Sequence, residues 1–195
     1  IAANGLSGSR IEDIAAKTLT SKRMIYYYFG DKIGLYRQVL EAAYREMREG
    51  ELALRTDRLE PVEALRALVD FTFLHHASSP EFIRLVMIEN VHQGRHLRES
   101  TVIRDLNASA IAKLKAIYVR GLDAGVFRPG IAALDLHWHI SALSFFNVSN
   151  SPTFSASFGD RPFRANGQRR LRKQVIEVIL RFVVRAELIQ QYVDG

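Results

Sequence analysis

The sequence contains no cysteine among its 195 residues, which excludes disulfide bonds and thiolate metal sites. A chain without cysteine is typical of a reducing compartment, and we expect a cytoplasmic protein. No run of about eighteen consecutive apolar residues is present, so we expect neither a membrane-spanning helix nor a membrane partner. The polar and apolar alternation of a half-buried strand is also missing, as are internal repeats. These absences predict an all-α protein.

The motifs that carry catalysis are missing as well. We find no nucleophile motif, no phosphate-cradling glycine loop and no convincing acid–base pair, so we expect no enzyme activity and no cofactor. His137 and His139 lie about 200° apart around a helix and cannot chelate one ion. Glu89, His92 and His96 have better spacing, but Gly94 interrupts the helix between the histidines. We therefore expect no metal site.

The chain does have an ample apolar share, 48%, and a net charge of +6. A basic chain favours polyanionic partners. Residues 1–37 hold six basic and three acidic side chains, a net charge of +3. A second basic run, at residues 169–173, has the composition of a solvated helix face.

Residues 9–32 predict two short helices around a tight turn. In the first, Ile11, Ile14 and Ala15 share one face at helical spacing. Hydroxyl side chains at residues 18–21 can then cap a second helix over residues 22–29. Gly30 ends that helix, and Asp31 can cap the next one. A helix pair that ends in a basic, aromatic surface suits entry into the major groove of double-stranded DNA.

Individual roles follow from the position of each residue on this helix pair. Base edges are expected to be contacted by side chains at the start of the second helix, and phosphates by side chains that flank it. We expect Tyr28 and Phe29 to be packed inside. The predicted base contacts are Ser21, Lys22, Arg23, Met24 and Tyr27, and the predicted phosphate contacts are Ser9, Arg10, Tyr26 and Lys32.

These residues also carry a family resemblance. The pattern formed by Gly5, Ser9, Ile11, 13–15 (Asp-Ile-Ala), Ser21, 26–29 (Tyr-x-Tyr-Phe) and 32–35 (Lys-x-x-Leu) resembles the DNA-binding signature of tetracycline-repressor (TetR) family regulators. The chain departs from the family pattern at Leu19, where the family usually has glycine, and at Arg23 and Met24, where it has small residues. A turn that needs a positive φ tolerates a non-glycine residue poorly. In the family a whole helix precedes Gly5, so the N-terminus is expected to be truncated in this sequence.

The remaining sequence predicts a larger helical domain. We place the DNA-binding domain at residues 1–46 and an effector-binding and dimerisation domain at residues 47–195. Apolar residues recur at three-and-four spacing in several segments, whereas residues 149–167 are rich in Ser, Gly, Pro and Asn and predict a loop. The expected helices span residues 32–55, 61–78, 80–92, 101–124, 132–148 and 168–192.

Two surfaces are expected in the larger domain. The last helix is apolar over most of its circumference, which indicates a homodimer built on residues 132–148 and 168–192. Polar and aromatic side chains within apolar helices indicate a small-molecule effector site, although internal hydrogen bonding explains each of them equally well. The dimerisation candidates are Leu143, Phe146, Val175, Ile176, Ile179, Phe182 and Val183. The effector candidates are Phe71, His75, Asn90, His92, Tyr118, His137, Trp138 and Phe145.

Residues 84–90 (Arg-Leu-Val-Met-Ile-Glu-Asn) and 137–142 (His-Trp-His-Ile-Ser-Ala) resemble the branch of the family that includes regulators of nicotinate and pyrimidine catabolism. That resemblance implies a small, anionic aromatic inducer. The sequence thus predicts a homodimeric repressor that a small effector releases from its operator. The alternative is a helical small-molecule-binding or enzymatic protein that does not bind DNA specifically.

Overall fold

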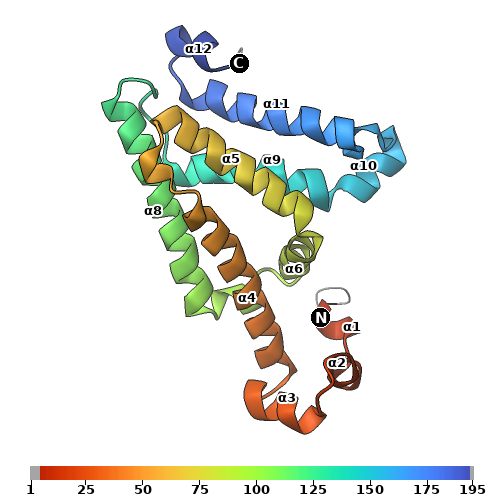
Figure 1. Ribbon diagram of the computed structural model, residues 1–195. Helices are drawn as coiled ribbons and strands as arrows, with labels where there is room; N and C mark the ends of the chain where they lie inside the picture. The colour runs from red at the N-terminus through yellow and green to blue at the C-terminus, as the bar shows by residue number, and fades with distance from the viewer. Residues whose placement is uncertain (1–4, 194–195) are drawn as a thin grey trace. The chain divides into compact units, whose positions relative to one another are not determined.

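The computed structural model describes residues 5–193, and the helices expected from the sequence account for most of them (Figure 1). Within this range no strand forms, and the only strand-like pairing is an isolated antiparallel bridge between Phe127 and Val184. The all-α prediction is therefore confirmed. The truncated helix expected before Gly5 concerns residues 1–4, which lie outside the described residues.

The chain divides into two compact units. The first comprises the residues up to Arg48 together with Pro80–Asn107, and the second comprises Glu49–Ser79 and the residues from Ala108 onward. By their contacts, residues 80–107 group with the N-terminal helices. The reason is an apolar cluster in which Leu85 and Ile103 pack with Tyr36 and Leu40.

The first unit is built from short helices around the first half of α4. Its elements are α1 (Gly5–Gly8), α2 (Ile11–Lys17), α3 (Lys22–Phe29), the start of α4 (Lys32–Ala53), α6 (Pro80–Val91), α7 (Arg95–Arg98) and the start of α8 (Thr101–Asp123). A small core holds the helix pair against α4, with Ile11 and Ala15 from α2, Ile25 from α3 and Leu35 from α4. These are the positions that helical periodicity assigns to the inner faces.

The second unit is a helical layer in which α5 packs on both α9 and α11 (Figure 1). Its largest buried side chains include Phe73, Phe127, Leu65, Leu136 and Ile179. Besides the ends of α4 and α8, its elements are η1 (Thr56–Arg58), α5 (Pro61–Ser78), α9 (Ala133–Ser149), α10 (Ser151–Phe158), η2 (Arg161–Phe163), α11 (Ala165–Val183), η3 (Ala186–Leu188) and α12 (Gln190–Val193).

Two expectations about this unit were wrong. Residues 149–167 are not a loop, because they contain α10 and η2. The ring of Phe154 lies 6.4 Å from Phe146 and 5.8 Å from Phe163, so aromatic packing orders a segment whose composition favours a loop. The last long helix ends at Val183, not near residue 192. The backbone leaves the helix there because Val184 pairs with Phe127 and the Arg185 N–H donates to the Val126 carbonyl at 3.0 Å.

Candidate nucleic-acid interface

The turn between α2 and α3 has the form that the helix-pair prediction requires. Leu19 occupies it with a φ of 53°, the left-handed region, and its side chain is almost fully exposed. The Thr18 hydroxyl donates to the Ile14 carbonyl at 2.8 Å and closes α2. The Ser21 hydroxyl accepts from the Met24 N–H at 3.2 Å and caps α3, as expected. A leucine therefore stands where the backbone favours glycine.

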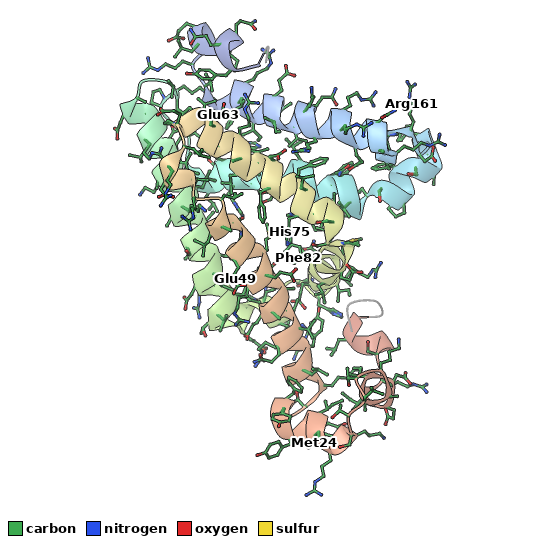
Figure 2. All side chains as sticks on the ribbon, in the orientation of Figure 1. Met24, Glu49, Glu63, His75, Phe82 and Arg161 are labelled. Carbon is green, nitrogen blue, oxygen red and sulfur yellow. The ribbon has the colours of Figure 1, made fainter. Side chains whose placement is uncertain are left out.

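Helix α3 presents an almost continuous polar and aromatic surface to solvent. Lys22, Arg23 and Met24 in its first turn are exposed, and so are Tyr26 and Tyr27. Met24 is labelled on this helix in Figure 2. Ile25 is the one buried residue of this helix, and together with the half-buried Phe29 it fixes α3 against the small core and leaves the rest of the circumference available for contact. Five predicted contact residues thus share one accessible helix.

Tyr28 does not pack inside as predicted. Its ring is 69% exposed and lies edge-on to Tyr27, with the ring centroids 5.2 Å apart. Phe29 is half-buried against the small core instead. The prediction failed because α3 turns only one narrow face to its neighbours, and Ile25 and Phe29 fill it. Tyr28 is therefore an additional exposed aromatic side chain next to the predicted contact surface.

The charges on this surface are only partly compensated. Lys22 forms an ion pair with Glu12 of α2, and the hydrogen bond from Lys22 holds the pKa of that carboxyl below its usual value. Arg23 has no polar partner within residues 5–193 and is exposed. Arg10 is also exposed and precedes the first turn of α2. Arg23 and Arg10 can therefore approach an anion without breaking an existing bond.

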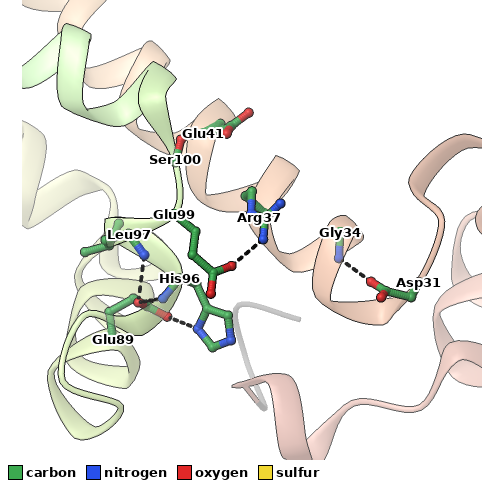
Figure 3. Close-up of polar contacts among 9 residues, drawn as sticks. All are labelled: Asp31, Gly34, Arg37, Glu41, Glu89, His96, Leu97, Glu99 and Ser100. Carbon is green, nitrogen blue, oxygen red and sulfur yellow. Dashed lines mark hydrogen bonds and ion pairs between the residues drawn. The ribbon is translucent and has the colours of Figure 1, made fainter.

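The other predicted phosphate contacts are less accessible. Ser9 is buried, and its hydroxyl donates to the Gly5 carbonyl at 2.7 Å, so its side chain serves the local fold. Lys32 is half-buried at the start of α4. This helix is capped by Asp31, whose carboxylate accepts from the Gly34 N–H at 2.6 Å (Figure 3). Lys32 therefore has a fixed backbone position near α3.

Polar contacts within the first unit hold α4 in place behind the helix pair (Figure 3). Arg37 binds Glu99 at 2.5 Å, and the Ser100 hydroxyl donates to Glu41 at 2.6 Å. The fully buried Glu89 carboxylate lies 2.8 Å from the His96 ring nitrogen Nδ1. Glu89 and His96, whose spacing was noted in the sequence, thus form a buried pair. Among the described residues, no three such side chains converge to hold a metal ion.

The eight effector candidates divide between the two units. Asn90 and His92 belong to the first unit and are exposed. In the second unit, Tyr118 has a structural role, because its hydroxyl donates to the Arg128 carbonyl at 2.7 Å and accepts from the Ile131 N–H at 3.1 Å. Trp138 is mostly exposed on α9. These four side chains therefore do not line one enclosed site within a single unit.

The remaining candidates lie on α5 and α9, and the ring of Phe71 lies against Gly50 of α4. Phe71 and His75 lie with their rings 5.7 Å apart on α5, and His76 is 6.5 Å from Phe145 of α9. His137 lies 3.4 Å from the Ser141 hydroxyl. Two buried residues of α5 and α9 were missed by sequence reasoning, His76 and Ser144. The Ser144 hydroxyl is fully buried and finds no hydrogen-bond partner among the described residues.

The dimerisation candidates also separate into two groups. Val175, Ile179 and Val183 are buried in the core of their own unit, so they are not available to a partner chain. Ile176 and Phe182 are half-buried against the same core. Leu143 and Phe146 are exposed on α9, and the exposed Trp138 lies on the same helix. We call Trp138, Leu143 and Phe146 the α9 surface.

No helix in the described part of the chain combines the length and the apolar character needed to cross a membrane.

Comparisons with known proteins agree with this geometry. A family model described as bacterial regulatory proteins of the tetR family matches residues 1–39, and one for the tetracyclin repressor-like C-terminal domain matches residues 61–179. The transcriptional repressor NicS of Pseudomonas putida is 39% identical over 78% of this chain and 72% of its own length. The repressor SCO4008 of Streptomyces coelicolor is 28% identical over 75% and 71%, respectively.

Solved structures share the fold at lower identity. A tetR-family regulatory protein from Rhodococcus RHA1 superposes with a TM-score of 0.71 at 19% identity, covering 93% of this chain and 90% of the other. The regulator FadR from Bacillus subtilis gives a TM-score of 0.71 at 18% identity, covering 92% and 91%. The chain belongs to the tetR family of bacterial regulatory proteins, and it is a DNA-binding transcriptional regulator, not an enzyme.

Proposed function

We propose that this protein is a homodimeric repressor that binds a near-palindromic operator through α3 and leaves it when a small effector binds the second unit. The observation that carries the DNA-binding step is the exposed first turn of α3, with Lys22, Arg23 and Met24 on a helix anchored by Ile25. The two relatives described above are named repressors, which supports the sign of regulation.

A dimer is needed because one short helix reads only one half-site. Two copies of α3 must lie about 34–36 Å apart to enter successive major grooves. The α9 surface supplies an apolar patch through which two copies can associate, since Trp138 and Phe146 are more than half exposed in the single chain. An effector that binds more tightly to a dimer whose two α3 helices have a different separation lowers the affinity for the operator. The operator affinity falls by the ratio of the effector's affinities for the two dimer conformations.

For the effector we propose an aromatic acid held between α5 and α9. Phe71 and Phe145 provide ring contacts, and the imidazoles of His75 and His76 lie beside them. The buried Ser144 hydroxyl is a donor that the described residues leave unused. Related folds were solved with isovaleryl coenzyme A, stearoyl-CoA and choline, so the fold accommodates ligands of different chemistry. The side chains of this chain must therefore decide the specificity.

Selection of operator sequences with the full chain, followed by binding measurements at several salt concentrations, tests the DNA-binding step. Arg23→Ala should weaken binding to the selected site by about 1–3 kcal/mol if Arg23 holds a guanine. Arg104→Ala is the matched control, because Arg104 is an exposed arginine on α8. If Arg23→Ala and Lys22→Ala both retain wild-type affinity and selectivity, α3 is not the reading helix.

Calorimetric titration with pyridine and benzene carboxylates tests the effector. Ser144→Ala should raise the dissociation constant of a binding acid by about tenfold, the equivalent of one lost hydrogen bond. It should not destabilise the free protein, because it removes a buried hydroxyl without a partner. Ser157→Ala is the control, since Ser157 is an exposed serine of α10 away from this contact. Unchanged affinity in Ser144→Ala contradicts the placement between α5 and α9.

A further inference from the structure

A second concave site lies in the second unit, on the side of α5 that meets α11. A groove of about 740 Å³ runs between these two helices, which lie side by side (Figure 1). Its lining includes Ala67 of α5 and Ile176 and Leu180 of α11. Glu63, labelled in Figure 2, lies on its α5 wall. The groove is separate from the proposed effector site, which lies where α5 meets α9.

Every carboxylate that lines the groove is already paired with an arginine. Glu63 binds Arg66 at 3.4 Å, and Glu177 binds Arg181 at 2.8 Å. Asp70 accepts two hydrogen bonds from Arg172 across the groove, which raise the pKa of that guanidinium.

Two lining cations remain without a carboxylate partner among the described residues, Arg169 and Lys173. The Arg169 guanidinium donates to the neutral amide oxygen of Asn166. The groove thus keeps an excess of positive charge.

The basic residues at and before the start of α11 cost this helix stability. Residues 160–173 contain six basic and one acidic side chain, a net charge of +5 against +6 for the whole chain. Arg169 and Lys173 are four positions apart on α11, where like charges destabilise a helix. The first turn of α11 contains no acidic residue to offset them. A bound anion would relieve this repulsion, whereas a purely structural helix gains nothing from it.

The groove is also polar at one end and apolar at the other. Arg169, Lys173, Ile176 and Leu180 follow one another at spacings of four, three and four residues, so they form one stripe along α11. The cations occupy its N-terminal half and the aliphatic side chains its C-terminal half. Tyr192 lies in the lining as well, and the Tyr192 carbonyl accepts from Arg66 at 2.5 Å, which fixes the C-terminal segment beside the groove.

We propose that this groove binds a small amphiphilic anion, with its acid head group on Arg169 and Lys173 and its apolar tail over Ile176 and Leu180. A guanidinium and an ammonium both bind carboxylate or phosphate oxygens through charge-assisted hydrogen bonds. The seven residue steps from Lys173 to Leu180 span about 10 Å of helix, close to the length of an extended ten-carbon tail. The site goes beyond the proposed function, because it uses neither α3 nor the contact between α5 and α9.

Isothermal titration calorimetry of the full chain with decanoate and with decyl phosphate, below their micellar concentrations, tests the proposal. Arg169→Glu/Lys173→Glu should weaken binding by about tenfold or more, because it reverses both free charges. Ala67→Trp should weaken it similarly by filling the groove. Arg104→Glu/Lys115→Glu is the matched control, since it changes the net charge equally at exposed positions outside the groove. Decanol, which lacks the acid, tests the contribution of the head group, and acetate, which lacks the long tail, tests the contribution of the tail.

The expected result is that both acids bind, that the groove variants lose this binding and that the control retains it. Absence of binding by both acids up to about 1 mM overturns the proposal. Equal binding of decanol and decanoate, or wild-type affinity in the Arg169→Glu/Lys173→Glu variant, does the same. Phosphatidylglycerol vesicles test whether the protein binds a bilayer surface instead of a free ligand. Adsorption to these vesicles without binding of free decyl phosphate also contradicts the proposal. If Ala67→Trp does not fold, the Arg169→Glu/Lys173→Glu variant, which changes two exposed residues, decides the outcome.

Discussion

Lys22 and Glu12 form an ion pair that joins the first turn of α3 to α2, and each side chain is more than half exposed. The pair has two consequences. It steadies the position of α3, and it occupies the ammonium group that we expect to contact DNA. Binding of DNA through Lys22 must therefore displace Glu12, so Glu12 competes with the nucleic acid for the same cation.

Glu12→Gln should strengthen DNA binding several-fold, because the carboxylate that neutralises Lys22 is removed. The measurement is operator affinity by fluorescence anisotropy at fixed salt, since electrostatic binding depends steeply on salt. In a double-mutant cycle the gain should shrink when Lys22 is also replaced by Ala. An equal gain in both backgrounds would show that Glu12 acts through general repulsion of DNA and not through Lys22.

Leu19→Gly should stabilise the first unit by about 1 kcal/mol, because a glycine adopts a positive φ without the steric cost that Leu19 bears. Little packing is lost, since the leucine side chain is 96% exposed. Thermal unfolding followed by circular dichroism measures the change. Ala42→Gly, at an exposed position in the interior of α4, is the opposite control and should destabilise by about 1 kcal/mol. Destabilisation by Leu19→Gly would show that the strain at Leu19 is smaller than the entropy that glycine adds to the unfolded chain.

Phe146→Glu should split the dimer and leave the protomer folded. The reason is that Phe146 is exposed on α9, whereas an introduced carboxylate in an apolar interface lacks a partner. Analytical ultracentrifugation combined with circular dichroism distinguishes splitting from unfolding. Ile179→Glu should unfold the chain instead, because Ile179 is 1% exposed in its own core. Leu52→Glu, at an exposed leucine of α4, is the control that should remain dimeric.

Gly121→Ala should destabilise the second unit by about 1–3 kcal/mol. A Cβ atom at this position would lie 1.9 Å from the Phe127 ring, which is fully buried and has no room to move. The clash outweighs the gain in helix propensity of about 1 kcal/mol that alanine normally brings. Urea denaturation measures the free energy of unfolding. Adding Phe127→Leu should recover part of the loss, and full tolerance of the single alanine would contradict the packing described.

The stability of the first unit should fall in alkali because of Tyr36. Burial, together with the nearby Glu89 carboxylate, raises the pKa of the Tyr36 hydroxyl far above its ordinary value of 10.0. The folded state therefore holds a proton that the unfolded chain releases, and stability present below pH 10 is lost as the pH rises, by up to about 1.4 kcal/mol per unit.

Tyr36→Phe should make the free energy of unfolding less dependent on pH between about 10 and 11. Tyr27→Phe, which removes the hydroxyl of an exposed ring, is the control. An unchanged pH dependence in Tyr36→Phe would assign the alkaline loss to other groups.

The sequence by itself determined the helices, the helix-turn-helix pair and its family, because these depend on interactions between residues close in the chain. Helical spacing identified the buried face of Ile11 and Ala15, and the hydroxyl residues at 18–21 were recognised as the segment that caps the second helix. The exposed first turn of α3 could be predicted for the same reason.

The tertiary structure decided which candidates lie inside and which outside. Apolar residues recur on several faces of α9 and α11, and periodicity alone does not tell the face that meets the protomer's own core from one that meets a partner. Contact with α5 buries Ile179 and Val183 and leaves Phe146 exposed. The packing of α5 against α9 and α11, likewise, brings His76 beside Phe145 and leaves the groove along Arg169 and Lys173. These pairings join residues tens of positions apart, and only the folded chain fixes which of them meet.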